Sequence, residues 1–155
     1  MVESAMNVDR PAASFQPYLL SLFRFITGLL LFQYGVAKIF KFPELAYFAN
    51  IPPLIQAAGW LELVLGALLM IGMLSRMSAF ILSGEMAFAY FLGHVLKTGE
   101  PVLLPLNNGG TAAILFCFAC LYLAVAGGGP TSVDTAIGRQ RASRDEEPQF
   151  RQAAE

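Results

Sequence analysis

The sequence predicts an all-α integral membrane protein, a bundle of four transmembrane helices. The main observation is four apolar runs of about 18–20 residues, the length that a helix needs to cross the hydrocarbon core of a bilayer. These runs are Leu19–Val36, Ile55–Leu74, Met77–Val95 and Asn108–Ala126. The composition agrees, with 56% hydrophobic residues, 14% charged residues and a mean hydropathy of +0.58. A soluble domain usually has about 25% charged residues.

The 155 residues leave no room for a soluble catalytic domain beside four spans. We divide the chain into a cytoplasmic N-terminal arm (residues 1–18), a transmembrane domain (19–137) and a flexible cytoplasmic tail (138–155). The arm carries Glu3 and Asp9 where a signal peptide carries basic residues, so we expect the first run to remain as an uncleaved helix. The net charge of −1 and the lack of a basic stripe argue against a nucleic-acid partner.

Basic residues beside the spans predict the orientation of the bundle. With four spans, the arm, the short turn after the second run and the tail lie on one side of the membrane. Near the membrane, that side carries the basic residues Arg10, Arg76, Arg139 and Arg141. The opposite side carries Lys38, Lys41 and Lys97. Cytoplasmic sides carry the excess of Lys and Arg, so we expect both termini in the cytoplasm of a bacterial inner membrane protein.

Three charged residues, Arg24, Glu62 and Glu85, lie inside three different runs. A charge at that depth is costly and usually faces the bundle interior. Helical spacing places Arg24 on one stripe with Gly28, Leu31, Gly35 and Lys38, and places Glu62 on another with Gly59, Gly66 and Leu69. Because small residues let helices approach closely, we expect these charged stripes to be the packing faces as well.

Two interpretations of these charges stay open. Arg24 could form a structural ion pair with Glu62 or Glu85 that only holds the helices together. Alternatively, one arginine facing two carboxylates would leave one carboxyl able to exchange a proton, which is a common use of carboxyl groups inside membranes. The second interpretation makes Arg24, Glu62 and Glu85 candidate residues of a ligand site or a proton relay.

A second candidate site lies where the fourth run begins. Asn107 and Asn108 lie at the opening of this run, on the same side of the membrane as Lys38 and His94. An asparagine there can cap the helix, which is a structural role. The alternative is that the free N–H groups of the helix start, with Lys38 and His94, bind a polar or anionic head group. A single histidine at the end of a span is more typical of an interfacial contact than of a ligand.

Cys117 and Cys120 have the Cys-x-x-Cys spacing of thiol redox proteins, but they lie about nine residues inside an apolar helix. A thiolate is disfavoured there, so we expect both cysteines to serve packing. No motif for binding zinc or haem is present, and we expect no metal.

Several short motifs of this chain resemble the DoxX family of small four-helix membrane proteins, over about residues 20–134. The matching motifs are Arg24-x-x-x-Gly28, Gly35-x-x-Lys38, Glu62-x-x-x-Gly66, Gly72-x-x-x-Arg76, Asn107-Asn108-Gly109-Gly110 and Gly127-x-Gly129-x-x-Ser132-Val133-Asp134. One departure is Thr111, where the family often has Glu. The role of that acidic residue does not carry over to this chain.

The resemblance implies a bacterial inner-membrane protein in a redox setting, because some relatives resemble the small subunit of thiosulfate:quinone oxidoreductase. We therefore expect a redox-associated membrane subunit that binds a quinone or a similar small apolar ligand, with no intrinsic cofactor. Its expected partners are the lipid bilayer, a redox partner subunit and a second copy of the chain. The alternatives are a non-enzymatic scaffold and a small transporter, and whether the chain is catalytic stays open.

Overall fold

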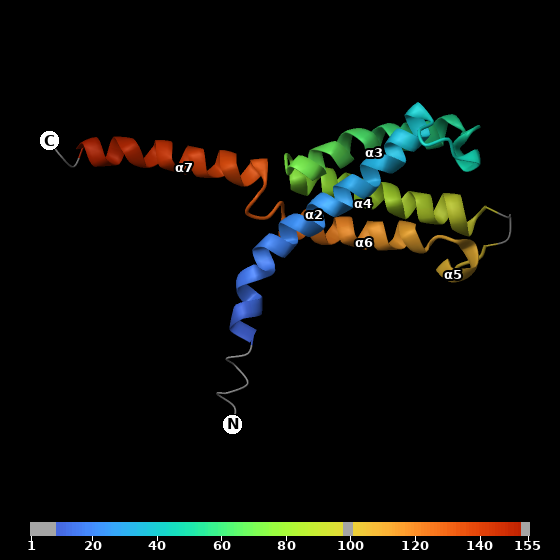
Figure 1. Cartoon of the computed structure of the whole chain (residues 1–155), viewed down its shortest axis with the longest axis horizontal. Coiled ribbons are helices and arrows are strands. Elements are labelled where there is room, and N and C mark those ends of the chain that lie inside the picture. The colour runs from blue at the N-terminus through green and yellow to red at the C-terminus, as the bar shows by residue number, and fades with distance from the viewer. Residues whose placement is uncertain (1–8, 98–100, 153–155) are drawn as a thin grey trace, which may run out of the picture.

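We analysed a computed structural model, which describes residues 9–97 and 101–152. The described residues form helices connected by short loops, with no strand among them. In chain order these helices are α2 (Asp9–Phe40), η1 (Ala46–Phe48), α3 (Pro53–Ile71), α4 (Ser75–Tyr90), η2 (Phe91–Val95), α5 (Pro105–Asn108), α6 (Thr111–Ala126) and α7 (Val133–Gln152). Figure 1 shows α2, α3, α4 and α6 as the bundle, and α7 extending away from it.

The bundle consists of two tightly packed helix pairs. α2 packs mainly on α3, and α4 packs mainly on α6, while the contacts between the pairs are fewer. The α2–α3 pair approaches closely at glycines, since a Cβ added at Gly28 or at Gly35 would lie 2.7 Å or 2.5 Å from backbone nitrogens of α3. The predicted small-residue stripes are therefore confirmed as the packing faces of this pair.

The bundle has two ends, which are named after the basic residue of α2 that lies nearest to each. The Arg24 end consists of the α3–α4 turn (residues 72–74) and the segment 127–135. The Lys38 end consists of the α2–α3 loop (residues 41–52) and the segments 96–97 and 101–110. Both described chain ends leave the bundle from the Arg24 end (Figure 1).

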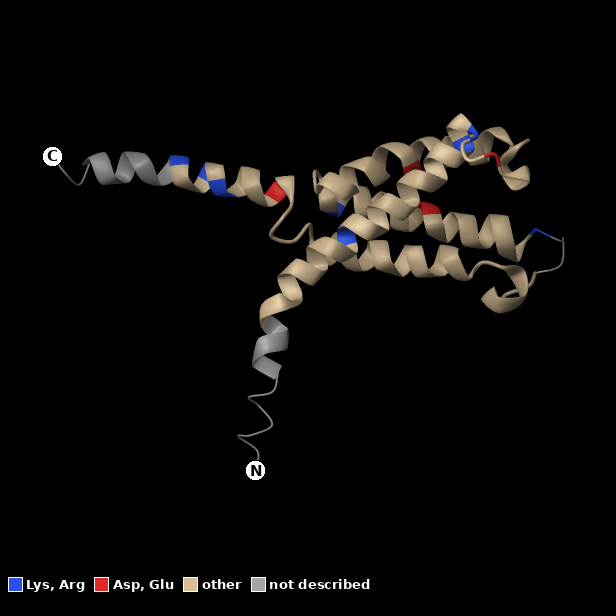
Figure 2. Cartoon of the chain, in the orientation of Figure 1, with Lys and Arg blue, Asp and Glu red and all other residues tan. Residues whose placement is uncertain are grey.

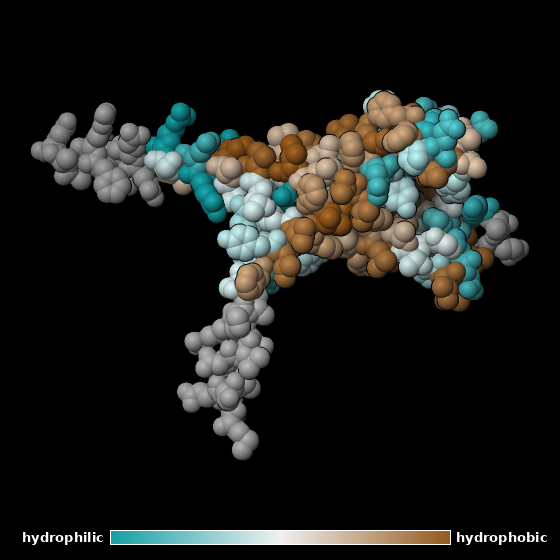
Figure 3. Space-filling view, viewed as in Figure 1, coloured by the Kyte–Doolittle hydropathy of each residue, from teal (hydrophilic) through white to brown (hydrophobic). Residues whose placement is uncertain are grey.

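Three helical segments are long and apolar enough to cross a membrane: Ser14–Phe40, Pro53–Ile71 and Ser75–Val95. The fourth, α6, is apolar but has only 16 residues. Many outward side chains are apolar, and Phe80, Phe88 and Val125 are 67–72% exposed. Figure 3 shows this hydrophobic surface across the middle of the bundle. The predicted all-α membrane bundle of four helices is confirmed.

Helix ends follow the local sequence. Pro53 begins α3, where its missing N–H and fixed φ are tolerated. Gly72 ends the same helix at φ +75°, and Met73 N–H then bonds back to the Leu68 carbonyl at 3.0 Å. This arrangement is a Schellman motif, which needs the left-handed conformation that glycine adopts without strain. The resulting sharp turn brings α4 directly back alongside α3.

Some boundaries differ from the sequence-based expectations. The fourth run was expected to begin at Asn108, but Gly109 adopts φ +73° and separates α5 from α6, which begins at Thr111. Residues 9–18, assigned to the arm, form the first part of α2. Residues 138–152, assigned to the tail, form the greater part of α7. The division into arm, domain and tail stays a prediction.

Candidate functional site

Arg24 is almost completely buried, with 3% of its surface exposed. Its Nη1 donates hydrogen bonds to the carbonyls of Leu69 and Met70, each at 2.5 Å, and its Nε donates to the Gly128 carbonyl at 2.8 Å. The last carbonyls of a helix have no intrahelical partner and carry the negative end of the helix dipole. Arg24 therefore caps the C-terminus of α3 and ties it to the chain that leaves α6.

Among the described residues Arg24 forms no ion pair with Glu62 or Glu85, so the structural ion pair, one of the two interpretations left open by the sequence, is wrong. The only salt bridge found among the described residues joins Lys38 to Glu62. Side chains of a helix lean toward its N-terminus, so Arg24 on α2 leans toward the Arg24 end. Glu62 lies seven residues before Leu69 on α3, which is about 10 Å deeper in the bundle. Arg24 and Lys38 share one helix stripe, as the spacing predicts, but the lean of the arginine side chain takes it away from Glu62.

Lys38 is the partner of Glu62. Its Nζ lies 2.6 Å from both carboxylate oxygens of Glu62, whose side chain is 2% exposed. The same lean toward the N-terminus that turns Arg24 away from Glu62 directs Lys38, at the end of α2, back into the bundle. The ring centroids of Tyr34 and Phe48 each lie 6.0 Å from Nζ, so both aromatic rings lie beside the ion pair. Lys38 was predicted at the mouth of the bundle, and the structure turns its ammonium group inward.

Among the ionisable residues that the structure describes, half-buried Glu85 is the one whose buried carboxyl has no partner. Both of its carboxylate oxygens are buried, and neither has a hydrogen bond within the described chain. The group lies close enough to Glu62, Lys38 and Cys120 to interact electrostatically with all three. Glu85 is ten residues from the start of α4 and Glu62 nine from the end of α3, so the two carboxylates lie at similar depth. We call Lys38, Glu62 and Glu85 the buried triad.

An unpartnered carboxyl at this depth is unusual because burying a polar group without a hydrogen bond costs free energy. The triad contains one cation and two carboxyl groups in an apolar surrounding. Such a group of side chains can bind a small polar function, or can take up and release a proton. Figure 2 shows how few charged residues the helices of the bundle carry.

The charged groups at the Arg24 end bond to backbone instead. Asp134 at the start of α7 accepts hydrogen bonds from the N–H groups of Leu74 and Ser75, both at 2.8 Å. Arg76 donates to the Val125 carbonyl of α6 at 2.7 Å. Asp134 is the last residue of the motif that begins at Gly127, but the sequence alone does not predict that it bonds to the start of α4.

The pKa of Asp134 is lowered from its ordinary value. Partial burial by itself would raise this pKa, but the hydrogen bonds from Ser75 and Leu74 and the nearby Arg24 guanidinium stabilise the charged form and outweigh it. Asp134 therefore acts as an anion that caps the N-terminus of α4 across a long sequence separation.

At the Lys38 end, the other predicted mouth residues serve the loop. His94 Nδ1 lies 3.1 Å from the Asn108 carbonyl oxygen. The Asn108 side chain donates to the Val102 carbonyl and accepts from the Gly110 N–H, both at 2.7 Å, which is an Asx turn and not a cap of α6 itself. Asn107 is exposed. Among the described residues, no hydrogen bond or ion pair joins His94, Asn107 or Asn108 to Lys38.

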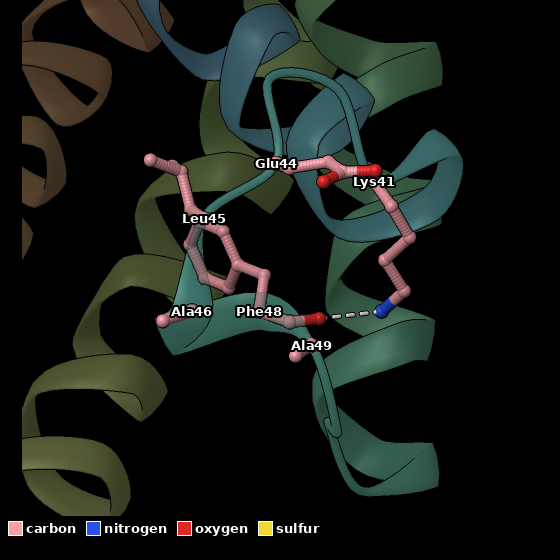
Figure 4. A pocket seen from close by; sticks show the side chains of 6 residues that line it. All are labelled: Lys41, Glu44, Leu45, Ala46, Phe48 and Ala49. Atoms are coloured by element: carbon pink, nitrogen blue, oxygen red, sulfur yellow. Dashed lines mark hydrogen bonds between the residues drawn. The ribbon is translucent and has the colours of Figure 1, made fainter.

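A shallow hollow of about 400 Å³ lies under the α2–α3 loop (Figure 4). Lys41 Nζ closes one side by donating to the Phe48 carbonyl at 2.6 Å. The lining residues are Lys41, Glu44, Leu45, Ala46, Phe48 and Ala49. Phe48 lines this hollow, and its ring centroid also lies 6.0 Å from the Lys38 ammonium. The hollow belongs to the loop and not to the buried triad.

The two cysteines have neighbours suited to packing. Cys120 is fully buried in the apolar core between α4 and α6, with Leu82 and Leu123 in the same cluster. Cys117 is half-buried, and Ser83 Oγ donates to its carbonyl at 2.8 Å. Both are free thiols. Among the described residues, no group of three or more His, Cys, Asp or Glu side chains is arranged to hold a metal ion.

The fold and the buried charges define a small helical membrane protein with ionisable groups inside its bundle. The DoxX family model matches residues 19–95, which include Arg24 and the whole buried triad. A Haemophilus influenzae protein described as an uncharacterized protein is 36% identical over 123 residues, covering 77% of this chain and 91% of that protein. No solved structure matches the chain. The chain belongs to the DoxX family.

Proposed function

We propose that this protein is a redox-associated membrane subunit that binds a quinone or a similar small apolar ligand beside the buried triad. The observation that carries the proposal is the Glu85 carboxyl, which is buried near Lys38 and Glu62 and has no hydrogen-bond partner among the residues that the structure describes. A bound carbonyl or hydroxyl group would supply the partner that Glu85 lacks. Arg24 is left out of the site because its Nε and Nη1 already donate to backbone carbonyls at the end of the bundle.

The chemistry of a quinone matches this set of groups. A quinone takes up two electrons and two protons to become a quinol, so its site needs a group that gives or accepts protons. Glu85 fills that role in our proposal. Lys38 and Glu62 orient the ligand, and their opposite charges compensate each other. The electrons come from a redox partner subunit or from a diffusible donor, since the two thiols of the chain lie in packed surroundings.

Ligand binding and proton transfer can be tested separately at Glu85. The purified protein in lipid nanodiscs is titrated with a short-chain ubiquinone by calorimetry, with empty nanodiscs as the control for partition into lipid. We expect saturable binding to the wild type and at least tenfold weaker binding to Glu85→Leu, which cannot bond to the ligand. The exposed loop variant Glu44→Gln is the matched control and should bind like the wild type.

Glu85→Gln keeps the size of the side chain and replaces the carboxyl group, which can give up a proton, by an amide, which cannot. We therefore expect Glu85→Gln to retain binding and to lose quinone turnover when the redox partner is present. Quinone uptake that is the same with and without the protein would contradict the proposal.

A scaffold without ligand is the second candidate function. The observation that favours it is the Arg24 end, where Arg24, Arg76 and Asp134 all bond to backbone groups and only fix the helices. A scaffold predicts no saturable quinone binding, so the same titration separates the two candidates.

We further propose that the protein lies in a bacterial inner membrane with both termini in the cytoplasm. The excess of arginines beside the spans supports this orientation. Reporter fusions at Glu100 and at the C-terminus should report opposite sides of the membrane. Reports from the same side would contradict the topology.

A further inference from the structure

The outer face of α2 carries a regular seam that the bundle does not use. α2 buries one face on α3 through Arg24, Gly28, Gly35 and Lys38. On its opposite face, residues recur at alternating spacings of four and three, and these seam residues are Leu22, Ile26, Leu29, Gln33, Val36 and Phe40. Four of the six are exposed, and Leu29 and Val36 are half-buried. This is the heptad spacing with which helices pair side by side.

Gln33 is the one polar residue of the seam. It is exposed, and it has no hydrogen bond within the described chain. It lies inside the candidate span Ser14–Phe40, seven residues from the end of that span, which is about 10 Å along the helix. Lipid tails offer an amide neither donors nor acceptors, so an amide at this position needs a partner from outside the chain.

We propose that the seam is the interface of a parallel dimer of this chain, in which the two Gln33 side chains bond to each other. Copies inserted in one membrane share one orientation, so a twofold axis along the membrane normal brings identical residues to the same depth. An amide carries both donors and an acceptor, and two glutamines therefore satisfy each other. A single polar residue in an apolar heptad seam is a common device for fixing the register and the number of helices.

This interface leaves the buried triad untouched. The seam lies on the side of α2 opposite the face that contacts α3, and Lys38 points from that inner face to Glu62. Loss of the dimer and loss of ligand binding can therefore be measured independently of each other.

Cysteine cross-linking tests the seam directly. In a chain with Cys117→Ala and Cys120→Ala, Ile26→Cys places one thiol on the seam, and Val64→Cys places one on the exposed face of α3 as a matched control. The native residues are 42% and 52% exposed. After reconstitution of the purified protein in phosphatidylcholine vesicles and mild oxidation, Ile26→Cys should form disulfide-linked dimers at least ten times faster than Val64→Cys.

The role of Gln33 is tested in the Ile26→Cys background. Gln33→Leu should weaken dimerisation by about 3- to 30-fold, the range known for hydrogen bonds between membrane helices. Gln33→Asn keeps the amide and should retain most of the cross-linking. Equal rates for Ile26→Cys and Val64→Cys, or a Gln33→Leu variant that cross-links like its parent, would overturn the proposal. Because Gln33 points outward, neither substitution disturbs the packed core.

Discussion

The Arg24 end and the buried triad use ionisable side chains in opposite ways. At the Arg24 end, the guanidinium of Arg24 and the carboxylate of Asp134 bond to backbone groups at the ends of helices. In the triad, Lys38 and Glu62 pair with each other, and Glu85 is left over. A buried charge that is fully hydrogen-bonded can be explained by structure alone. A buried charge without a partner needs another explanation, and ligand binding supplies one.

Stability measurements can sharpen this difference. A structural charge should destabilise the fold when it is removed, because its partners are left unsatisfied. A charge kept for function should not, because its own burial is already unfavourable.

Arg24→Leu should lower the free energy of unfolding by about 3–5 kcal/mol, since the carbonyls of Leu69, Met70 and Gly128 lose their hydrogen bonds to the guanidinium. Arg24→Lys should lose less free energy of unfolding, because the lysine ammonium keeps a positive charge near the end of α3. It cannot donate to several carbonyls at once in the fixed geometry of a guanidinium. Reversible unfolding with sodium dodecyl sulfate in mixed micelles measures both. A loss below about 1 kcal/mol for Arg24→Leu would remove the basis of the capping role.

Lys38→Met should lower the free energy of unfolding by up to about 3 kcal/mol, because it leaves the carboxylate of Glu62 buried and unpaired. The double variant Lys38→Met with Glu62→Leu should recover most of this loss, since no charge then remains without a partner. The same unfolding assay gives the coupling between the two sites. Losses that simply add in the double variant would show that the two side chains do not form a pair.

Asp134→Asn should lower the free energy of unfolding by about 0.5–2 kcal/mol at neutral pH, the range for a lost helix cap. The pKa of Asp134 is lower in the folded protein than in the unfolded chain. Its contribution is therefore present above the unfolded value, about 3.9, and is lost as the pH falls through the lower folded value. Unfolding curves between about pH 6 and about pH 3 should show this acid-side loss in the wild type and a smaller one in Asp134→Asn.

The combined variant Cys117→Ala with Cys120→Ala should have the smallest effect. It removes two sulfur atoms from the α4–α6 contact and should reduce the free energy of unfolding by about 1 kcal/mol, with ligand affinity unchanged. Calorimetric titration of the double variant checks the affinity. A complete loss of redox activity in a variant that still folds would assign the thiols a chemical role.

Helical periodicity and hydrophobic run length predict much of this fold. The stripe containing Arg24 and Lys38 and the stripe containing Glu62 could be predicted because residues three and four apart share a helix face. The burial of Glu85 could be expected because charges inside membranes face the bundle interior. These inferences need only the spacing of residues along one helix.

Partner choice could not be predicted from spacing alone. Arg24 and Lys38 share a stripe, but the lean of side chains toward the helix N-terminus sends Arg24 to the end of α3 and Lys38 to Glu62. The cap that Asp134 provides joins residues about 60 positions apart, so its partners depend on the closed bundle. The absence of a partner for Glu85 likewise depends on the positions of all its neighbours.

The most direct test of the account measures stability and ligand affinity on one variant, Glu85→Leu in nanodiscs. Because the leucine replaces a buried carboxyl that lacks a partner, the account predicts an unchanged or higher thermal midpoint. The same variant should bind the short-chain ubiquinone at least tenfold more weakly than the wild type. A lower midpoint together with unchanged quinone affinity would contradict it, since Glu85 would then be a structural residue like Arg24.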